Sequence, residues 1–124
     1  MPWTYSQSTG RLSRGGRVVG YGYSGHGTGV NNASQQGVHN VGPIPRGRYR
    51  IGPAGMHVSS RGGRLPNSMQ LNPMGHNALG RTGFLIHGDT REANHTASTG
   101  CIILGPGIRN QVASSGDRVI EVVE

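Results

Sequence analysis

Apolar residues in this chain come in short runs that alternate with polar residues and stop at glycine-containing turns. The first runs are Trp3–Gln7, Arg11–Arg14 and Arg17–Tyr23, and Thr-Gly and Gly-Gly pairs lie between them. Alternation over so few residues is typical of half-buried strands, and turns of this kind join hairpins. The pattern predicts three antiparallel strands at the start of the chain.

The rest of the chain predicts more short strands, long loops and one helix. Strands are expected at Arg48–Ile51, Met69–Leu71, Gly83–His87, Cys101–Leu104 and Arg118–Val123. Loops are expected at Gly25–Gly42 and Asn72–Thr82, and residues 53–68 are expected to be irregular, with an exposed turn at Arg61–Arg64. Ile108 and Val112 are spaced for one short helix that ends at Gly116. The prediction is a mainly β fold, a sandwich or barrel of short strands.

Composition sets the size of this fold. The chain has 124 residues, with 23 glycines, 7 prolines and a single cysteine. We expect one domain over residues 1–124, a monomer held by packing alone, since one cysteine forms no internal disulfide. No apolar leader or membrane-length stretch occurs in the sequence, so we expect a protein made in the cytoplasm without a signal peptide or a membrane span.

The net charge is +7, and all 12 basic residues are arginine. Arginine favours planar contacts with carboxylates and phosphates, so an anionic partner fits, although scattered arginines also serve solubility alone. Aromatic residues are few and no basic helix is apparent, which argues against nucleic acid as the partner.

Two predicted strands each carry one reactive side chain at an end. Cys101 follows Ser98-Thr99-Gly100, and His87 ends the run Phe84-Leu85-Ile86. An imidazole is the usual base for a cysteine nucleophile, and the glycine lets backbone amides face a developing oxyanion. The alternative is that Cys101 is a small buried apolar residue. The sequence favours acyl transfer by Cys101 with His87 as base.

Other residues are candidates for supporting roles. His95 is an alternative base, and Asp89 is a candidate to orient His87 or to cap a local turn. Arg81 and Arg109 are candidates to bind a substrate carboxylate, or surface charges. Tyr21, Tyr23 and Asn32 are candidates to line the substrate groove, although tyrosine is also common in strand packing.

Rival functions remain at this point. His87, Asp89, His95 and Cys101 are all zinc-ligand types, but no paired ligand motif such as His-x-x-x-His is present, and we expect no metal and no cofactor. Papain-like peptidases place Cys before His, whereas here His comes first. Sortases have the order His, Cys, Arg, which Arg109 would complete, but their histidine lies further upstream. A non-catalytic envelope-binding β domain is the alternative from another class.

The pattern His…Ser-x-Gly-Cys-Ile resembles the catalytic domain of L,D-transpeptidases. A wider set of motifs is similar to one branch, the L,D-transpeptidase-like (YkuD-related, Tlde1-like) effector domains of type VI secretion systems. The motifs lie at Gln7–Leu12, Gly22–Gly25, Asn31-Asn32, Gly42–Tyr49, Gly83–Asp89 and Gly116-Asp117. Two positions depart from the general signature, because Thr99 replaces a histidine and Ile103 stands where Arg or Asn is common.

The resemblance implies a β domain that acts on peptidoglycan stem peptides. Its relatives cut tetrapeptide stems before the terminal D-alanine through a cysteine acyl-enzyme, and pass the acyl group to water or to a D-amino acid. By this resemblance Cys101 is the nucleophile and His87 the base, with Gly88, Ser98, Thr99 and Gly100 as orienting or oxyanion residues. It further implies an antibacterial effector that acts in the periplasm of a target bacterium, with an immunity protein and a secretion adaptor as partners; a phage or housekeeping cell-wall peptidase is the alternative.

Overall fold

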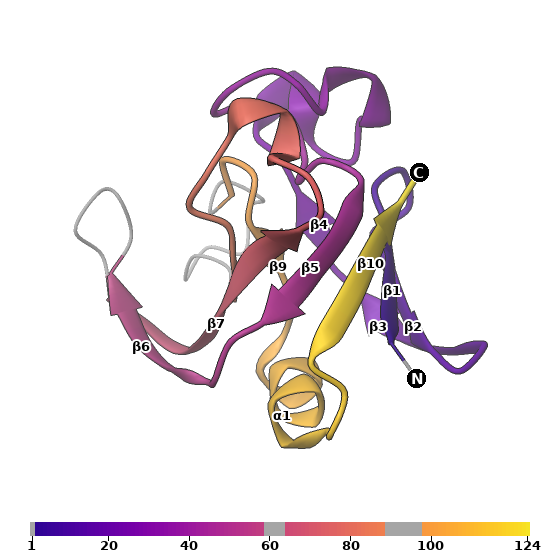
Figure 1. Ribbon diagram of the computed structural model, residues 1–124, viewed down its shortest axis with the longest axis vertical. Helices are drawn as coiled ribbons and strands as arrows, with labels where there is room; N and C mark the ends of the chain where they lie inside the picture. The colour runs from indigo at the N-terminus through magenta and orange to yellow at the C-terminus, as the bar shows by residue number, and fades with distance from the viewer. Residues whose placement is uncertain (1, 59–63, 89–97) are drawn as a thin grey trace.

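The computed structural model describes residues 2–58, 64–88 and 98–124, and in these ranges the chain is mainly β with one α-helix (Figure 1). The strands are β1 (Trp3–Ser6), β2 (Arg11–Arg14), β3 (Arg17–Tyr21), β4 (Tyr23–Ser24), β5 (Gly47–Ile51), β6 (Gly55–Val58), β7 (Arg64–Met74), β8 (Leu85–His87), β9 (Ile102–Ile103) and β10 (Val119–Val123). The helix is α1 (Pro106–Ser114), and three 3-10 turns are η1 (Gly27–Gly29), η2 (Ala33–Gln35) and η3 (Ala78–Gly80). The predicted fold class is confirmed.

The strands form one mixed sheet that folds back on itself. Its order is β3-β2-β1-β10-β5-β7-β8-β9-β4, with β6 paired to β7. The pairs β1–β10 and β8–β9 are parallel, and the other pairs are antiparallel. Strands β3 and β4 stand at opposite ends of this order but are consecutive in the chain, so the sheet curls around a common core.

The opening three strands are confirmed, but the third is shorter than predicted. It ends at Tyr21, and Gly22 turns the chain into β4, which pairs with β9 rather than β2. A side chain at Gly22 would lie 2.0 Å from the Ile103 carbonyl oxygen, so only glycine fits where the chain changes neighbours. This turn brings Tyr23 and Ser24 beside the cysteine strand.

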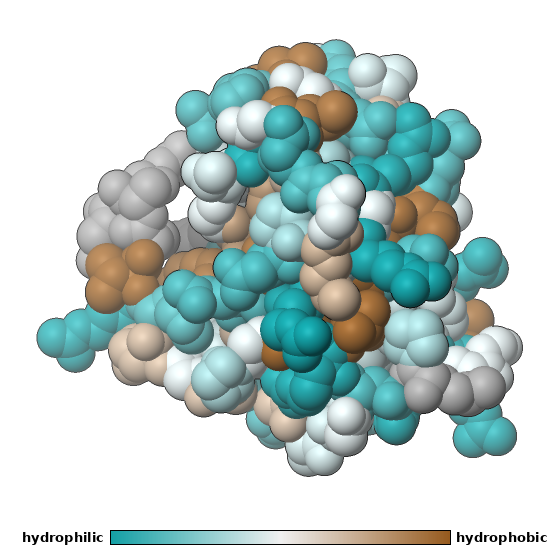
Figure 2. All heavy atoms as spheres, in the orientation of Figure 1, coloured by the Kyte–Doolittle hydropathy of each residue, from teal (hydrophilic) through white to brown (hydrophobic). Residues whose placement is uncertain are grey.

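Alternating apolar residues of the central strands fill the core. Tyr49 and Ile51 of β5 and Ile120 and Val122 of β10 are buried. Full burial of such a side chain contributes roughly 1.5–3 kcal/mol. Hydrophilic residues cover much of the face in Figure 2, and apolar ones appear there in small separate groups. The core cluster comprises Trp3, Tyr5, Leu12, Ile44, Tyr49, Ile51, Met69, Leu71, Ala78, Phe84, Ile86, Ile102, Leu104, Val112, Ile120 and Val122.

The prediction of irregular structure over residues 53–68 is wrong. Strand β6 and the first half of β7 form a hairpin there, and β7 continues to Met74, so the loop that follows is shorter than predicted. The hairpin projects from the sheet (Figure 1), and most of its residues are at least partly exposed, so it lacks the apolar alternation that marks a buried strand. The predicted turn at Arg61–Arg64 lies outside the described residues except for Arg64.

The predicted helix is confirmed as α1. Pro106 occupies its first turn, where a missing amide hydrogen costs nothing, and Gly105 precedes it. The helix ends at Ser114, slightly before the predicted stop at Gly116. Val112 packs into the core from the end of the molecule that α1 covers (Figure 1).

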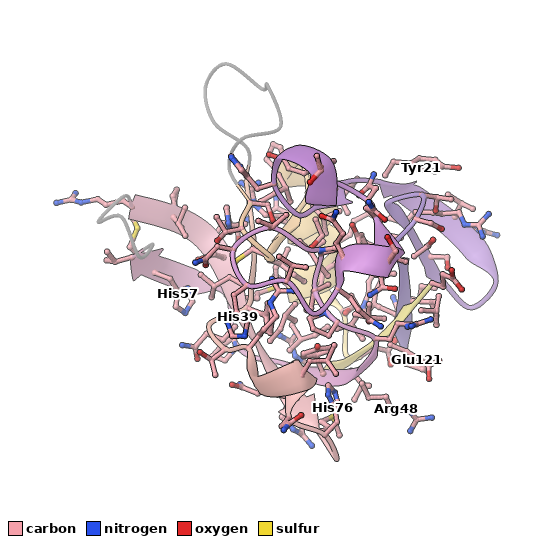
Figure 3. The ribbon with its side chains drawn as sticks, turned by 90° about the horizontal axis from the view of Figure 1, so that it is seen from above. Tyr21, His39, Arg48, His57, His76 and Glu121 are labelled. Atoms are coloured by element: carbon pink, nitrogen blue, oxygen red, sulfur yellow. The ribbon has the colours of Figure 1, made fainter. Side chains whose placement is uncertain are left out.

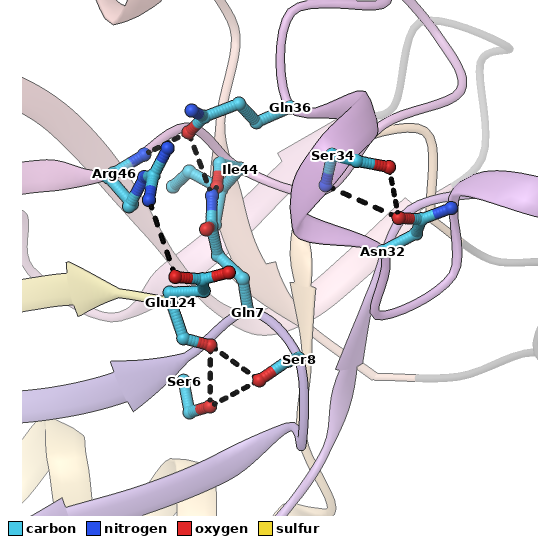
Figure 4. Close-up of polar contacts among 9 residues, drawn as sticks. All are labelled: Ser6, Gln7, Ser8, Asn32, Ser34, Gln36, Ile44, Arg46 and Glu124. Carbon is cyan, nitrogen blue, oxygen red and sulfur yellow. Dashed lines mark hydrogen bonds and ion pairs between the residues drawn. The ribbon is translucent and has the colours of Figure 1, made fainter.

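The predicted loop from Gly25 to Gly42 folds into η1 and η2 and is fastened to the sheet by side-chain amides. Gln7 donates to the Ile44 carbonyl and to Gln36 Oε1, at 2.9 and 3.0 Å (Figure 4). Asn32 Oδ1 accepts from the amide and the hydroxyl of Ser34 and so caps η2. This loop therefore has a defined position beside the cysteine turn.

Candidate active site

His87 ends β8, and Cys101 directly precedes the neighbouring strand β9. In the parallel pair β8–β9, Ile86 lies opposite Ile102 and His87 opposite Ile103. Ile86 and Ile102 are buried in the core, and side chains alternate along a strand, so His87 and Ile103 face the other side. The Leu85 amide donates to Cys101 Sγ at 3.3 Å, which agrees with this register.

Ser98 holds the turn that presents Cys101. It is fully buried, its hydroxyl donates to the Cys101 carbonyl at 2.6 Å, and its oxygen accepts from the amides of Gly25 and Gly100, each at 3.0 Å. One hydroxyl thus joins the cysteine turn to the start of the Gly25–Gly42 loop. The structure assigns Ser98 an orienting role.

The Gly100 amide does not fit the predicted oxyanion role. Its hydrogen is bonded to Ser98, and its carbonyl accepts from the Ser24 hydroxyl at 3.0 Å. Within the described residues the Cys101 amide has no hydrogen-bond acceptor, so it is the donor left by this turn. Thr99 takes part through its carbonyl, which accepts from Arg81.

The Cys101 thiol sits in a poorly hydrated setting. Burial raises its pKa to about 11, and the hydrogen bond from the Leu85 amide and the positive charge of Arg81 oppose this rise only in part. At neutral pH the resting side chain is therefore a neutral thiol rather than a preformed thiolate. A base must remove its proton during attack.

Alkylation of Cys101 by iodoacetamide should accordingly be slow at neutral pH and should rise about tenfold per pH unit toward pH 11, because the thiolate is the reacting species. Cys101 is the only cysteine, so intact-mass measurement reports it without interference. A rate that levels off below pH 8 would show an acidic thiol and contradict this reading.

His87 is buried, and a backbone carbonyl fixes its tautomer. Its Nδ1 lies 2.8 Å from the Gly88 carbonyl oxygen, which only accepts, so Nδ1 carries the hydrogen. In the neutral ring the basic lone pair is then on Nε2. The Gly88 carbonyl thus holds the imidazole in one orientation, and the general-base role of His87 stays a prediction.

Arg109 of α1 reaches the backbone beside His87. Its guanidinium donates to the Leu104 carbonyl at 2.6 Å and packs so close to Gly88 that a side chain there would lie 2.5 Å from Nη1. Its Nε is buried and has no hydrogen-bond partner within the part of the chain described. Arg109 therefore remains a candidate for binding a carboxylate.

Arg81 has a different environment from the one predicted. It is only 4% exposed, and its guanidinium donates to backbone carbonyls of the protein itself. Its donors are committed within the fold, so the predicted contact with a substrate carboxylate does not fit this geometry.

The remaining candidates divide into those near the site and those elsewhere. Tyr23 is buried on β4 opposite Ile103, so it faces the same side as His87. Asn32 is used to cap η2, and Tyr21 is exposed at the end of β3. Asp89 and His95 lie outside the described residues.

Two other histidines have structural partners (Figure 3). His57 Nδ1 lies 2.7 Å from the Ser68 hydroxyl within the β6–β7 hairpin. His76 bonds the Arg48 carbonyl and the Ala78 amide. Across the residues described, no three His, Cys, Asp or Glu side chains gather into a metal-binding group. No helix in the same ranges is long and apolar enough to cross a membrane.

Sequence reasoning missed Ser24 and Phe84 as parts of the site. Ser24 joins the Gly100 carbonyl to the Ile44 amide, and the Phe84 ring lies under the Arg81 guanidinium, 5.4 Å from ring centroid to Cζ. Both lie inside the motifs quoted for the resemblance, which was the available signal.

The fold is similar to that of L,D-transpeptidase domains. An L,D-transpeptidase from Stackebrandtia nassauensis matches with a TM-score of 0.64 at 15% identity, over 99% of this chain and 55% of that one. A mutant L,D-transpeptidase of Enterococcus faecium matches with a TM-score of 0.60 at 13% identity, over 98% and 49%. L,D-transpeptidase 1 of Mycobacterium tuberculosis matches with a TM-score of 0.55 at 19% identity, over 98% and 60%. The chain thus spans roughly half the length of these proteins.

Residues 19–119 match the Tlde1 domain, and the chain belongs to this family. No curated protein sequence matches it. The family resemblance deduced from the motifs is confirmed, and the solved structures confirm the fold.

Proposed function

We propose that this protein is a peptidoglycan-modifying cysteine enzyme that acts on tetrapeptide stems as an L,D-carboxypeptidase and L,D-transpeptidase. The observation that carries the proposal is that His87 ends β8 while Cys101 directly precedes the parallel neighbour β9 and its Sγ accepts a hydrogen bond from the Leu85 amide of β8. The family and the fold agree with it.

The proposed reaction has two steps. Cys101 Sγ attacks the carbonyl carbon of the third stem residue while its proton passes to His87 Nε2; the C–N bond then breaks, and that proton leaves with the amine of D-alanine. This leaves a thioester. Water or the amine of a free D-amino acid then attacks the thioester, the thiol is regenerated, and the product is a tripeptide or an exchanged tetrapeptide. The Cys101 amide is the proposed oxyanion donor.

The raised pKa of Cys101 favours proton removal in concert with attack, since the thiolate is little populated at rest. Arg109 is the proposed contact for a stem carboxylate, because its guanidinium lies beside Gly88 and its Nε has no hydrogen-bond partner within the described ranges. Tyr23 is proposed to line the groove on the same face.

The deciding experiment is digestion of purified peptidoglycan followed by mass spectrometry of the muropeptides. Tripeptide stems and free D-alanine are expected, and added D-methionine should appear in exchanged tetrapeptides. Unchanged muropeptides from a folded protein would contradict the enzyme. Sedimentation of that protein with peptidoglycan would then support the envelope-binding alternative.

Chelators should leave this activity unchanged, because a cysteine nucleophile needs no cation to attack an amide carbonyl. Activity is compared with and without EDTA, and bound metal is measured in the purified protein. Stoichiometric zinc whose removal abolishes activity would favour metal-assisted hydrolysis instead.

We further propose that the protein is a type VI secretion effector that acts in the periplasm of a target bacterium. Expressed in the cytoplasm it should be harmless, whereas fusion to an export signal should cause swelling or division defects that require Cys101. The proposed immunity protein would act in the periplasm and present an acidic face to the +7 domain. Equal Cys101-dependent toxicity of the cytoplasmic form would show that the substrate is not the cell wall.

A further inference from the structure

Arg81 is a buried cation that ties two segments together behind the nucleophile. Its Nη1 donates to the carbonyls of Gln36 and Pro43 at 2.6 and 2.8 Å, and its Nη2 to those of Gly42 and Thr99 at 3.0 and 3.1 Å. The first three carbonyls lie at the end of the Gly25–Gly42 loop and just after it, and the fourth belongs to the turn that carries Cys101. One guanidinium therefore fixes that turn relative to the loop.

The fit around this guanidinium is close. A side chain at Gly100 would lie 2.5 Å from Arg81 Nη2 and 3.1 Å from Phe84 Cε1. The Phe84 ring packs against the guanidinium, which adds a cation–π contact. The Arg81 guanidinium therefore has little freedom to move away from this position.

No carboxylate neutralises Arg81 within the described residues. The ion pairs found among these residues join Arg14, Arg46 and Arg48 to carboxylates elsewhere on the protein. A buried cation held by carbonyl dipoles alone is costly, and it favours any negative charge that forms nearby. Two groups that can become negative interact electrostatically with it, the Tyr49 phenol and the Cys101 thiol, and of these only Cys101 belongs to the turn that Arg81 holds.

We propose that Arg81 is a positioning residue for Cys101: it fixes the Thr99–Gly100 backbone and supplies the countercharge to the sulfur as its proton leaves. This role rests on the proposed function only for its effect on turnover, since thiol reactivity is measured without any cell-wall substrate. Burial raises the pKa of Cys101 and lowers that of Arg81, and the electrostatic interaction between the two groups opposes both shifts.

The test is the rate of Cys101 alkylation by iodoacetamide between pH 6 and pH 10, read by intact mass. Arg81→Gln removes the charge but keeps an amide donor, and its rate should fall about tenfold at each pH, equivalent to a rise of about one unit in the thiol pKa. Arg81→Lys keeps the charge but not the planar fork, so it should react within about threefold of the original protein while melting at a lower temperature.

Arg118→Gln is the matched control. Arg118 also donates to four backbone carbonyls, those of Ile51, Gly52, Ala113 and Ser115, at the other end of the fold. The Arg118→Gln variant should be less stable than the original protein, but its rate of Cys101 alkylation should be unchanged at each pH. A folded Arg81→Gln protein with the original profile would overturn the proposal. If Arg81→Gln does not fold, Arg81→Lys is the deciding variant. Alkylation of Cys101 that is slowed tenfold or more despite the retained charge would overturn the proposal, and alkylation at nearly the original rate would support it.

Discussion

Cys101→Ala is expected to abolish the conversion of tetrapeptide to tripeptide stems, with a loss on the order of 10⁴-fold or more, while the fold remains intact. The reason is chemical, because no other residue of the chain is a thiol. The side chain is half-buried, and its sulfur makes one contact from the Leu85 amide and a weak one to Gly83, so its removal leaves a small defect. Muropeptide analysis and circular dichroism together check the result.

His87→Ala should cause a loss of similar size, because the thiol pKa of about 11 leaves little thiolate without a base. Groups that act as one unit give non-additive losses, so the double variant should be hardly worse than either single one. His95→Ala is the informative comparison. Full activity of folded His87→Ala together with loss in His95→Ala would move the base to His95.

Gly100→Ala is expected to destabilise the protein by about 2–3 kcal/mol and to remove most of its activity. Gly100 has a φ of +140°, which L side chains rarely adopt, and the added Cβ would meet the Arg81 guanidinium and the Phe84 ring. An arginine normally moves aside, but this one is held by four carbonyls. Thermal unfolding and muropeptide analysis measure the two effects.

Gly107→Ala provides the matched control. Gly107 lies in the first turn of α1, and a side chain there would meet no atom within 4 Å. Alanine favours the helix over glycine by about 0.5–1 kcal/mol, so this variant should be slightly more stable and fully active. Equal destabilisation by both substitutions would show that the Gly100 environment is not special.

Hydrogen bonds from polar side chains, rather than apolar packing, hold the turn that carries Cys101 in place. The Ser98 hydroxyl bonds the Gly100 amide and the Cys101 carbonyl. The Ser24 hydroxyl donates to the Gly100 carbonyl, and the Arg81 guanidinium donates to the Thr99 carbonyl. All three groups also contact the Gly25–Gly42 loop or the residues after it. The position of that loop and the geometry of the nucleophile are therefore linked.

Apolar alternation was enough to predict the strands that show it, and residue type with position was enough to single out the two candidate catalytic residues. Short alternating runs bounded by glycine predicted β1, β2 and β10, and His87 and Cys101 stood out because reactive side chains at strand ends are unnecessary for packing. The β6–β7 hairpin was missed because its residues have no buried face and therefore no periodic signal. Its pairing depends on contacts between backbones.

The partners of the other polar residues depend on how the chain folds. In the sequence Arg81 and Arg109 are equivalent candidates for a carboxylate contact, since residue type does not encode which carbonyls surround a side chain. Folding buries Arg81 behind Gly100, whereas the Arg109 guanidinium packs beside Gly88 and its Nε has no hydrogen-bond partner among the residues described. Likewise Gly100 matches an oxyanion signature, but the neighbouring Ser98 accepts from its amide and the distant Ser24 donates to its carbonyl. Such assignments depend on segments far apart in the chain meeting in space, and local patterns contain no information about that meeting.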